Sequence, residues 1–267
     1  MMVKAIVLSG YGINCEEETA FAFRKAGAET EIVHINDLIA APQKLSEFRI
    51  LAFPGGFSYG DDTGSGNALA NKIKSNIWPA IEKFIEAENL VIGICNGFQA
   101  IANLGLVPGF EKCFGERKIA LMRNNSARYE CRWVYLKAFS KKCVFTKGIE
   151  TIRLPVAHGE GKFFAEKNVL EKLNENSQVV FRYANEKGAL AKGRFPANPN
   201  GALEDIAGIC NETGRVFGLM PHPERNILFT QQNGWLLQKE KLKREGKSLP
   251  DESEGMRIFR NAVEYFK

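Results

Sequence analysis

The sequence predicts an α/β fold with a mostly parallel central sheet and flanking helices. Up to Gly105, short apolar runs alternate with amphipathic stretches, as they do where helices connect parallel strands. Several of these runs end at glycines, which commonly mark the turns that follow strands. Beyond Gly105 the apolar runs continue with little helix between them, which predicts a β-rich extension of the fold.

Four apolar runs in the first part of the chain have the length of buried parallel strands. They are Lys4–Leu8, Thr30–Ile35, Ile50–Phe53 and Leu90–Ile94. Helices are expected at about Glu16–Lys25, at about Ile77–Glu88 and from Gly97 to Leu104. Gly27 and Gly105 follow two of these helices, and a glycine at that position often ends a helix.

The second part of the chain contains six further expected strands, which either extend the sheet or form a separate β-rich layer. They are Ile119–Met122, Arg132–Leu136, Thr151–Leu154, Val179–Tyr183, Ile206–Cys210 and Val216–Leu219. A last amphipathic helix is expected at about Ser253–Phe266. Before it, residues from about 226 to 255 form a polar, partly helical excursion from the core.

Composition excludes several classes of protein. No apolar run approaches the roughly 18 residues of a membrane span, and the first residues lack the pattern of a signal peptide. The six cysteines form no CxxC pair, so we expect reduced thiols and a cytoplasmic protein that binds no metal. The net charge of +5 does not indicate a nucleic-acid-binding protein. Much of it lies in Lys239–Lys247, which is either a solvated helix face or a surface that docks on an acidic partner.

Gly93–Gly97 (GICNG) lies between an expected strand and an expected helix, with Cys95 at its centre. A nucleophile between two glycines at a strand-to-helix turn is typical of a nucleophile elbow. The helix N-terminus that follows would favour the thiolate of Cys95. A buried cysteine in a glycine-rich turn is the alternative interpretation.

His222 follows the expected strand Val216–Leu219, and Glu224 stands two residues further on. A histidine there can reach a nucleophile on a neighbouring strand, and Glu224 can fix its tautomer. Alone, the pair reads as an ordinary loop, but together with Cys95 it predicts a catalytic triad. Because Cys95 and His222 lie 127 positions apart and must meet, the motifs predict one domain over residues 1–267.

A second glycine-rich turn, Pro54-Gly55-Gly56, follows the expected strand Ile50–Phe53. Its backbone N–H groups are unshielded, so one of them could form an oxyanion hole with the N–H of Asn96. The sequence contains no convincing ATP site. Gly10–Cys15 is an incomplete dinucleotide motif, and the P-loop spacing of Gly55–Gly60 is followed by two aspartates that would repel phosphate.

These motifs together resemble the class I (triad) glutamine amidotransferases, whose fold is flavodoxin-like. Within that family, longer stretches are similar to the glutaminase subunits of phosphoribosylformylglycinamidine synthase. These are PGGFSYGD (Pro54–Asp61), GICNGFQ (Gly93–Gln99), AHGEGKF (Ala157–Phe163), FRYAN (Phe181–Asn185), NPNGA (Asn198–Ala202) and IAGICNETGRVFGLMPHPER (Ile206–Arg225). The chain departs from the family pattern at Asp62–Asn67, which leaves the triad motifs untouched.

The resemblance implies that Cys95 is the nucleophile, His222 the general base and acid, and Glu224 its orienting carboxylate. It implies that Gly56 and Asn96 supply the oxyanion N–H groups. The substrate-binding residues it implies are Gly55, Gln99 and His158, although a structural role or a place at a partner interface stays open for His158.

The implied activity is hydrolysis of glutamine, with the ammonia passed to a separate synthetase subunit that acts in purine biosynthesis. The implied partners are that synthetase subunit together with a small accessory subunit, with ATP and Mg²⁺ bound by the synthetase and no cofactor in this chain. Two alternatives stay open. One is a stand-alone cysteine or γ-glutamyl hydrolase on the same fold, and the other is a non-catalytic interaction module.

Overall fold

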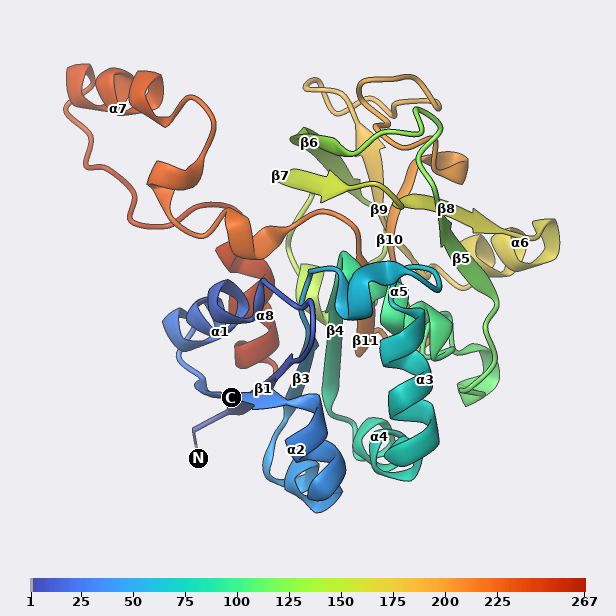
Figure 1. Ribbon diagram of the computed structural model, residues 1–267. Helices are drawn as coiled ribbons and strands as arrows, with labels where there is room; N and C mark the ends of the chain where they lie inside the picture. The colour runs from blue at the N-terminus through green and yellow to red at the C-terminus, as the bar shows by residue number, and fades with distance from the viewer. Residues whose placement is uncertain (1) are drawn as a thin grey trace.

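The computed structural model describes residues 2–267 and contains one large sheet of nine strands with helices on both sides (Figure 1). The strand order is β2-β1-β3-β4-β11-β10-β9-β6-β7. The first five strands in this order pair in parallel, and every later pairing is antiparallel. The predicted fold class is therefore confirmed, with the parallel half and the β-rich half joined in a single sheet.

The parallel half is formed by the most deeply buried runs of the sequence. Its strands are β1 (Lys4–Ser9), β2 (Glu29–His34), β3 (Ile50–Phe53), β4 (Leu90–Ile94) and β11 (Val216–Leu219). In β3, β4 and β11 every residue is buried, as expected for central strands covered by helices on both faces.

The antiparallel half extends the sheet from β11. It contains β10 (Ile206–Cys210), β9 (Val179–Ala184), β6 (Glu130–Ala138) and β7 (Thr151–His158). Two further strands, β5 (Ile119–Met122) and β8 (Lys162–Ala165), form a separate antiparallel pair. Extension of the sheet and a small separate layer, which the sequence left as alternatives, thus both occur.

Helices cover the parallel half on two sides. On one side α1 (Glu16–Lys25) packs on α8 (Met256–Glu264), with the Phe23 and Phe259 rings 5.0 Å apart (Figure 1). On the other side α5 (Asn96–Asn103) lies against β3, β4 and β11, with α3 (Asn67–Asn76) beside it and α4 (Trp78–Glu86) next. No helix among residues 2–267 has both the length and the apolar character needed to cross a bilayer.

Three helices were not predicted: α2 (Ile35–Ala40), α3 and α6 (Lys167–Glu175). The first is a short helix of six residues that continues directly from β2, and the other two carry many Asn and Lys residues, so their apolar stripes are short. Within the polar excursion, α7 (Trp235–Arg244) buries none of its residues and projects away from the sheet (Figure 1). In this chain its basic side chains therefore face solvent.

Two glycines let α5 approach the sheet closely. Gly93 of β4 and Gly218 of β11 are directly paired neighbours beneath this helix. A Cβ on Gly93 would lie 2.6 Å from the Gly97 carbonyl oxygen, and a Cβ on Gly218 would lie 2.1 Å from the Phe98 ring. Both distances are far below van der Waals contact, so the position of α5 depends on the missing side chains.

We expect Gly218→Ala to destabilise the protein by about 1–3 kcal/mol, because the added methyl forces Phe98 and α5 to shift in a packed core. Urea unfolding followed by circular dichroism measures the free energy of unfolding. Gly159→Ala is the matched control, since a Cβ there has no neighbour within 4 Å, and it should change stability by less than about 0.5 kcal/mol. Equal stability of both variants would show that α5 has room to move.

Candidate active site

Cys95 occupies a strained turn between β4 and α5, as an elbow requires. Its φ and ψ are 52° and −107°, a region that non-glycine residues rarely adopt. The N–H of Cys95 donates to the Leu219 carbonyl at 2.8 Å, and its carbonyl accepts from Gln99 N at 3.1 Å. These bonds fix the turn to β11 on one side and to α5 on the other.

The turn is tight because Gly97 packs against β3. A Cβ at Gly97 would lie 1.8 Å from the Phe53 carbonyl oxygen, so no other residue fits without moving the helix. The Cys95 side chain is consequently held at the carboxyl end of the parallel strands, the edge at which open α/β sheets bind ligands. Its sulfur lies 3.8 Å from the Ala157 carbonyl oxygen of β7.

His222 and Glu224 lie directly beyond β11, and Glu224 belongs to the 3₁₀ turn Pro223–Arg225. The His222 N–H donates to the Pro155 carbonyl of β7 at 2.8 Å, which anchors the turn to the antiparallel half of the sheet. The Nδ1 atom of His222 and the Oε1 atom of Glu224 are 2.5 Å apart, and both side chains are fully buried. The Nε2 atom of His222 has no partner within residues 2–267 and is left for a group at the reaction site.

The charge state of His222 is set by opposing effects. Burial disfavours the imidazolium, but the Glu224 carboxylate and then the nearby Cys95 outweigh it and hold the pKa of His222 well above its usual value. A ring that keeps its proton beside a nucleophilic thiol is the arrangement on which cysteine hydrolases depend. The structure thus brings together the three side chains predicted as a triad, with Cys95 at the end of β4 and both His222 and Glu224 in the turn after β11.

The Gly55-Gly56 turn lies against both the elbow and the loop that follows β1. The N–H groups of Gly56 and Asn96 donate no hydrogen bond within residues 2–267, so both are free to bind an oxyanion. The Asn96 side chain accepts from Ser58 N at 3.0 Å and so ties this turn to the elbow. Packing against His222 also favours glycine at position 55, because a Cβ there would lie 2.9 Å from the Cε1 atom of His222.

Gln99 is held inside a polar network. Its Oε1 atom accepts from Asn96 Nδ2 at 3.0 Å, and its Nε2 atom donates to the Glu160 carbonyl at 2.5 Å. Asn96 also donates to the carboxylate of Asp61, whose pKa is raised by burial, although hydrogen bonds from Gly66 and Asn96 oppose the rise. Gln99 therefore links the elbow helix to the loop after β7, and its predicted contact with glutamine stays a prediction.

The departure segment Asp62–Asn67 closes over this network. Ser65 donates through its hydroxyl to Glu160 Oε2 at 2.6 Å, and Asn103 of α5 donates to the Ser65 carbonyl at 3.0 Å. A cavity of about 100 Å³ lies beneath the segment, with Gln99 and Glu160 in its wall. The unusual residues thus keep a defined fold beside the elbow.

His158 lies at the end of β7, immediately after the Ala157 carbonyl that faces Cys95. Its ring is packed over Gly161 and stands 3.4 Å from Asn200 Nδ2. Burial first, and the charge of His222 second, lower the pKa of His158 to about 3, so the ring is neutral at physiological pH. Its predicted place in the substrate site therefore stays a prediction, beside the interface and structural alternatives.

Sequence reasoning missed two residues beside the triad, Cys15 and Arg225. Cys15, His222 and Glu224 place one ligand atom each within 4.8 Å of one another, the only such group among residues 2–267 that could hold a metal ion. Arg225 Nη2 donates to the Cys15 sulfur at 3.0 Å, and this fixed positive charge makes the group unfavourable for a cation. The expectation that the chain holds no cofactor stays a prediction. The position of Cys15 in the sequence could have indicated its place in the site, because it closely follows β1 at the sheet edge that carries the triad.

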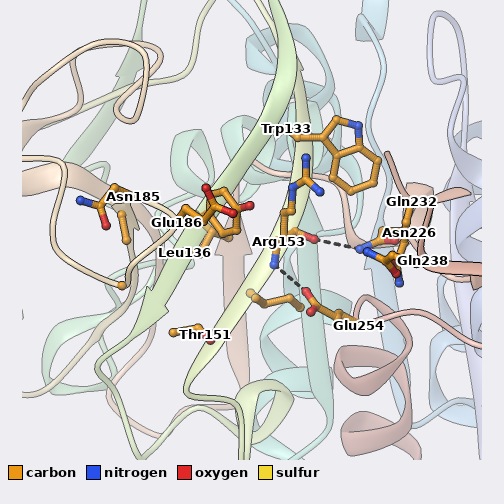
Figure 2. Close-up of a pocket in the computed structure, with 14 residues that line it drawn as sticks. Trp133, Leu136, Thr151, Arg153, Asn185, Glu186, Asn226, Gln232, Gln238 and Glu254 are labelled. Carbon is orange, nitrogen blue, oxygen red and sulfur yellow. Dashed lines mark hydrogen bonds between the residues drawn. The ribbon is translucent and has the colours of Figure 1, made fainter. Parts of the chain in front are cut away.

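A larger pocket, of about 260 Å³, lies on another part of the surface and contains none of the predicted site residues (Figure 2). The pocket lies between strands β6 and β7 on one side and the polar excursion on the other. Figure 2 shows Arg153 at its centre, where the Arg153 N–H donates to Glu254 Oε2 at 2.7 Å and Asn226 Nδ2 donates to the Arg153 carbonyl at 2.8 Å. These bonds fasten the two ends of the excursion to β7, the strand that also anchors His222.

The buried His158 predicts a specific acid sensitivity. In the unfolded chain its pKa returns to about 6.5, so below that pH the unfolded state binds a proton that the folded state refuses until about pH 3. Stability should therefore fall as pH drops from 6.5, by at most about 1.4 kcal/mol per unit from this residue. Urea unfolding between pH 4 and 7 should show a shallower fall for His158→Asn than for the unchanged chain. Parallel curves would mean that His158 is hydrated and titrates normally.

Comparison with known proteins agrees with this geometry. A family model described as the CobB/CobQ-like glutamine amidotransferase domain matches residues 2–266. Among curated proteins, the phosphoribosylformylglycinamidine synthase subunit PurQ of Methanococcus maripaludis is 55% identical over 264 residues, covering 98% of this chain and 97% of that protein. The protein of the same name from Dehalococcoides mccartyi is 49% identical, with 98% and 97% covered.

Solved structures give the same result. The structure of PurLQS from Thermotoga maritima contains a chain with a TM-score of 0.72 and 31% identity, and the match covers 100% of both chains. A putative GMP synthase protein from Thermoplasma acidophilum has a TM-score of 0.54 at 14% identity, with 99% of this chain and 94% of that chain covered, which shows a shared fold only. With a family model over almost its whole length and relatives at about half identity, this chain belongs to the glutamine amidotransferase family.

Proposed function

We propose that this chain is the glutaminase subunit of a phosphoribosylformylglycinamidine synthase, with Cys95, His222 and Glu224 as its catalytic triad. The observation that carries the proposal is the strained elbow at Cys95 beside a buried His222–Glu224 pair whose Nε2 atom is free. The names of the relatives support the particular synthase.

The geometry supports a two-step acyl transfer. The Cys95 thiolate attacks the γ-carboxamide carbon of glutamine, and the N–H groups of Gly56 and Asn96 bind the oxygen that becomes negative. His222 then gives its proton to the leaving nitrogen, which departs as ammonia and leaves a glutamyl thioester on Cys95. The neutral His222 next removes a proton from water, which attacks the thioester and releases glutamate. Glu224 holds the ring in one orientation throughout and stabilises its charged form.

The ammonia has to be consumed elsewhere, since neither glycine-rich turn of this chain has the residues of an ATP site. We propose that a synthetase subunit receives it and uses ATP and Mg²⁺ to convert formylglycinamide ribonucleotide to the amidine, and that a small accessory subunit completes the complex. The three-subunit name of the Thermotoga maritima structure supports this assembly. Purine biosynthesis from soluble precursors also supports the proposed cytoplasmic location.

The decisive test is covalent labelling by the glutamine analogue diazo-oxo-norleucine, followed by peptide mass spectrometry. We expect one adduct on Cys95, formed fastest in the presence of the synthetase partner, because the reagent is attacked by the same thiolate that attacks glutamine. Cys95→Ala should abolish both the adduct and glutamine hydrolysis, a loss of at least about 10³-fold.

Cys113→Ala is the matched control, because this thiol is exposed and lies in no predicted site. It should leave labelling and hydrolysis unchanged. An adduct on another residue would contradict the triad. High activity of the isolated chain on γ-glutamyl peptides would favour the stand-alone hydrolase, and full function of Cys95→Ala would favour an interaction module.

A further inference from the structure

Cys15 is a second buried thiol beside the triad. It stands directly before α1 without a side-chain capping bond, and no part of it is exposed. Its N–H donates to the Gly55 carbonyl at 3.3 Å, and its carbonyl accepts from Thr19 N at 3.1 Å. Cys15 is therefore fixed by its own backbone and cannot move away from the site without unfolding the start of α1.

The sulfur of Cys15 joins this fixed point to the triad turn. Arg225 Nη2 donates to it at 3.0 Å, while the thiol donates to Asn14 Oδ1 at 3.2 Å. The Nε atom of the same Arg225 lies 3.9 Å from Glu224 Oε1, the oxygen that bonds His222. One guanidinium thus connects Cys15 with the carboxylate that orients the base.

The orientation of Glu224 depends on few contacts. Its Oε2 atom is buried and has no partner within residues 2–267, so His222 and Arg225 are the groups that hold the carboxylate. Arg225 keeps 36% of its side chain exposed. Without an acceptor at Cys15, the Arg225 guanidinium would be more stable turned outward into water, because an unpaired charge is better solvated there.

We propose that Cys15 and Arg225 form a positioning pair that fixes the orientation and the electrostatic environment of the His222–Glu224 couple during glutamine hydrolysis. This inference rests on the proposed function of the same site. Cys15 touches both Arg225 and the His222 ring, and it forms no bond to substrate, since it is enclosed and lies on no strained turn.

Charge provides the readout that separates positioning from simple packing. The titratable or charged groups around His222 are Glu224 and Arg225 on its own turn, Cys15 at the start of α1, Cys95 before α5, His158 at the end of β7 and Tyr129 before β6. Arg225 is the one cation with a permanent charge in this group. Loss of this positive charge favours the protonated forms of the neighbouring groups. The pH profile of glutamine hydrolysis should therefore move to higher pH.

The experiment compares Cys15→Ala, Cys15→Ser, Arg225→Gln and the double variant Cys15→Ala/Arg225→Gln. For each we would measure kcat and KM for glutamine against pH, in complex with the synthetase subunits. Cys15→Ala and Arg225→Gln should lower kcat about tenfold with KM within about twofold, because a misplaced base slows chemistry more than binding. Arg225→Gln should also move the profile upward by about half a pH unit, because it removes the charge itself.

Two further results are expected from the same set. The double variant should be no worse than either single variant, since both changes break one interaction. Cys15→Ser should recover most of the lost activity, because its hydroxyl also accepts a hydrogen bond from Arg225. Cys210→Ala is the control for removal of a fully buried thiol elsewhere, and it should leave the pH profile unchanged.

Additive losses with an unshifted pH profile would overturn the proposal and leave Cys15 as a packing residue. The rate at which iodoacetamide alkylates Cys95, followed against pH by mass spectrometry, gives a readout that needs no glutaminase activity. If the unchanged chain fails to hydrolyse glutamine but Arg225→Gln still shifts this alkylation profile upward, the proposed function fails and the positioning pair stands. An unshifted alkylation profile in an active enzyme rejects the pair alone.

Discussion

The site depends on how closely α5 approaches the sheet. Gly93 and Gly218 remove the side chains that would separate this helix from β4 and β11, and Gly97 removes the one that would strike β3. With the helix at this distance, the turn before it has no room for an ordinary backbone conformation. The positive φ of Cys95 follows from that constraint, and its strain is balanced by the packing of α5.

The remaining parts of the site are tied to the elbow through backbone groups. The carbonyls of β7 accept from the His222 N–H and face the Cys95 sulfur, so the antiparallel half of the sheet supports the parallel half. The carbonyl of Gly55 accepts from Asn14 and Cys15, which brings the loop after β1 against the back of His222. Backbone contacts of this kind preserve geometry while side chains change protonation during a reaction.

The sequence predicted β3, β4 and β11 with their observed bounds, because fully buried parallel strands are continuous apolar runs. It ended β7 at Leu154, four residues before His158, and missed β8, because a proline interrupts the first run and the second spans only four residues. It also predicted Cys95, His222 and Glu224, since each stands at the end of such a strand in a short motif. Helices α3 and α6 were missed because they contain many polar residues, and the helical periodicity of their few apolar residues is weak. Asp61, Cys15 and Arg225 were missed because their importance comes from contacts between distant segments, and such contacts leave no local periodicity.

The departure segment shows where family resemblance and physical structure give different information. Its sequence differs from the family pattern, yet Ser65 and Gly66 still hold it against Glu160 and Asp61 beside the elbow helix. Gly66 lies so close to α5 that a Cβ would stand 2.6 Å from Ala100 N. What this segment must keep is therefore a small residue against α5 and a hydrogen-bond donor toward the loop after β7. Gly64 adds a backbone requirement to these two, because its φ of 98° favours glycine.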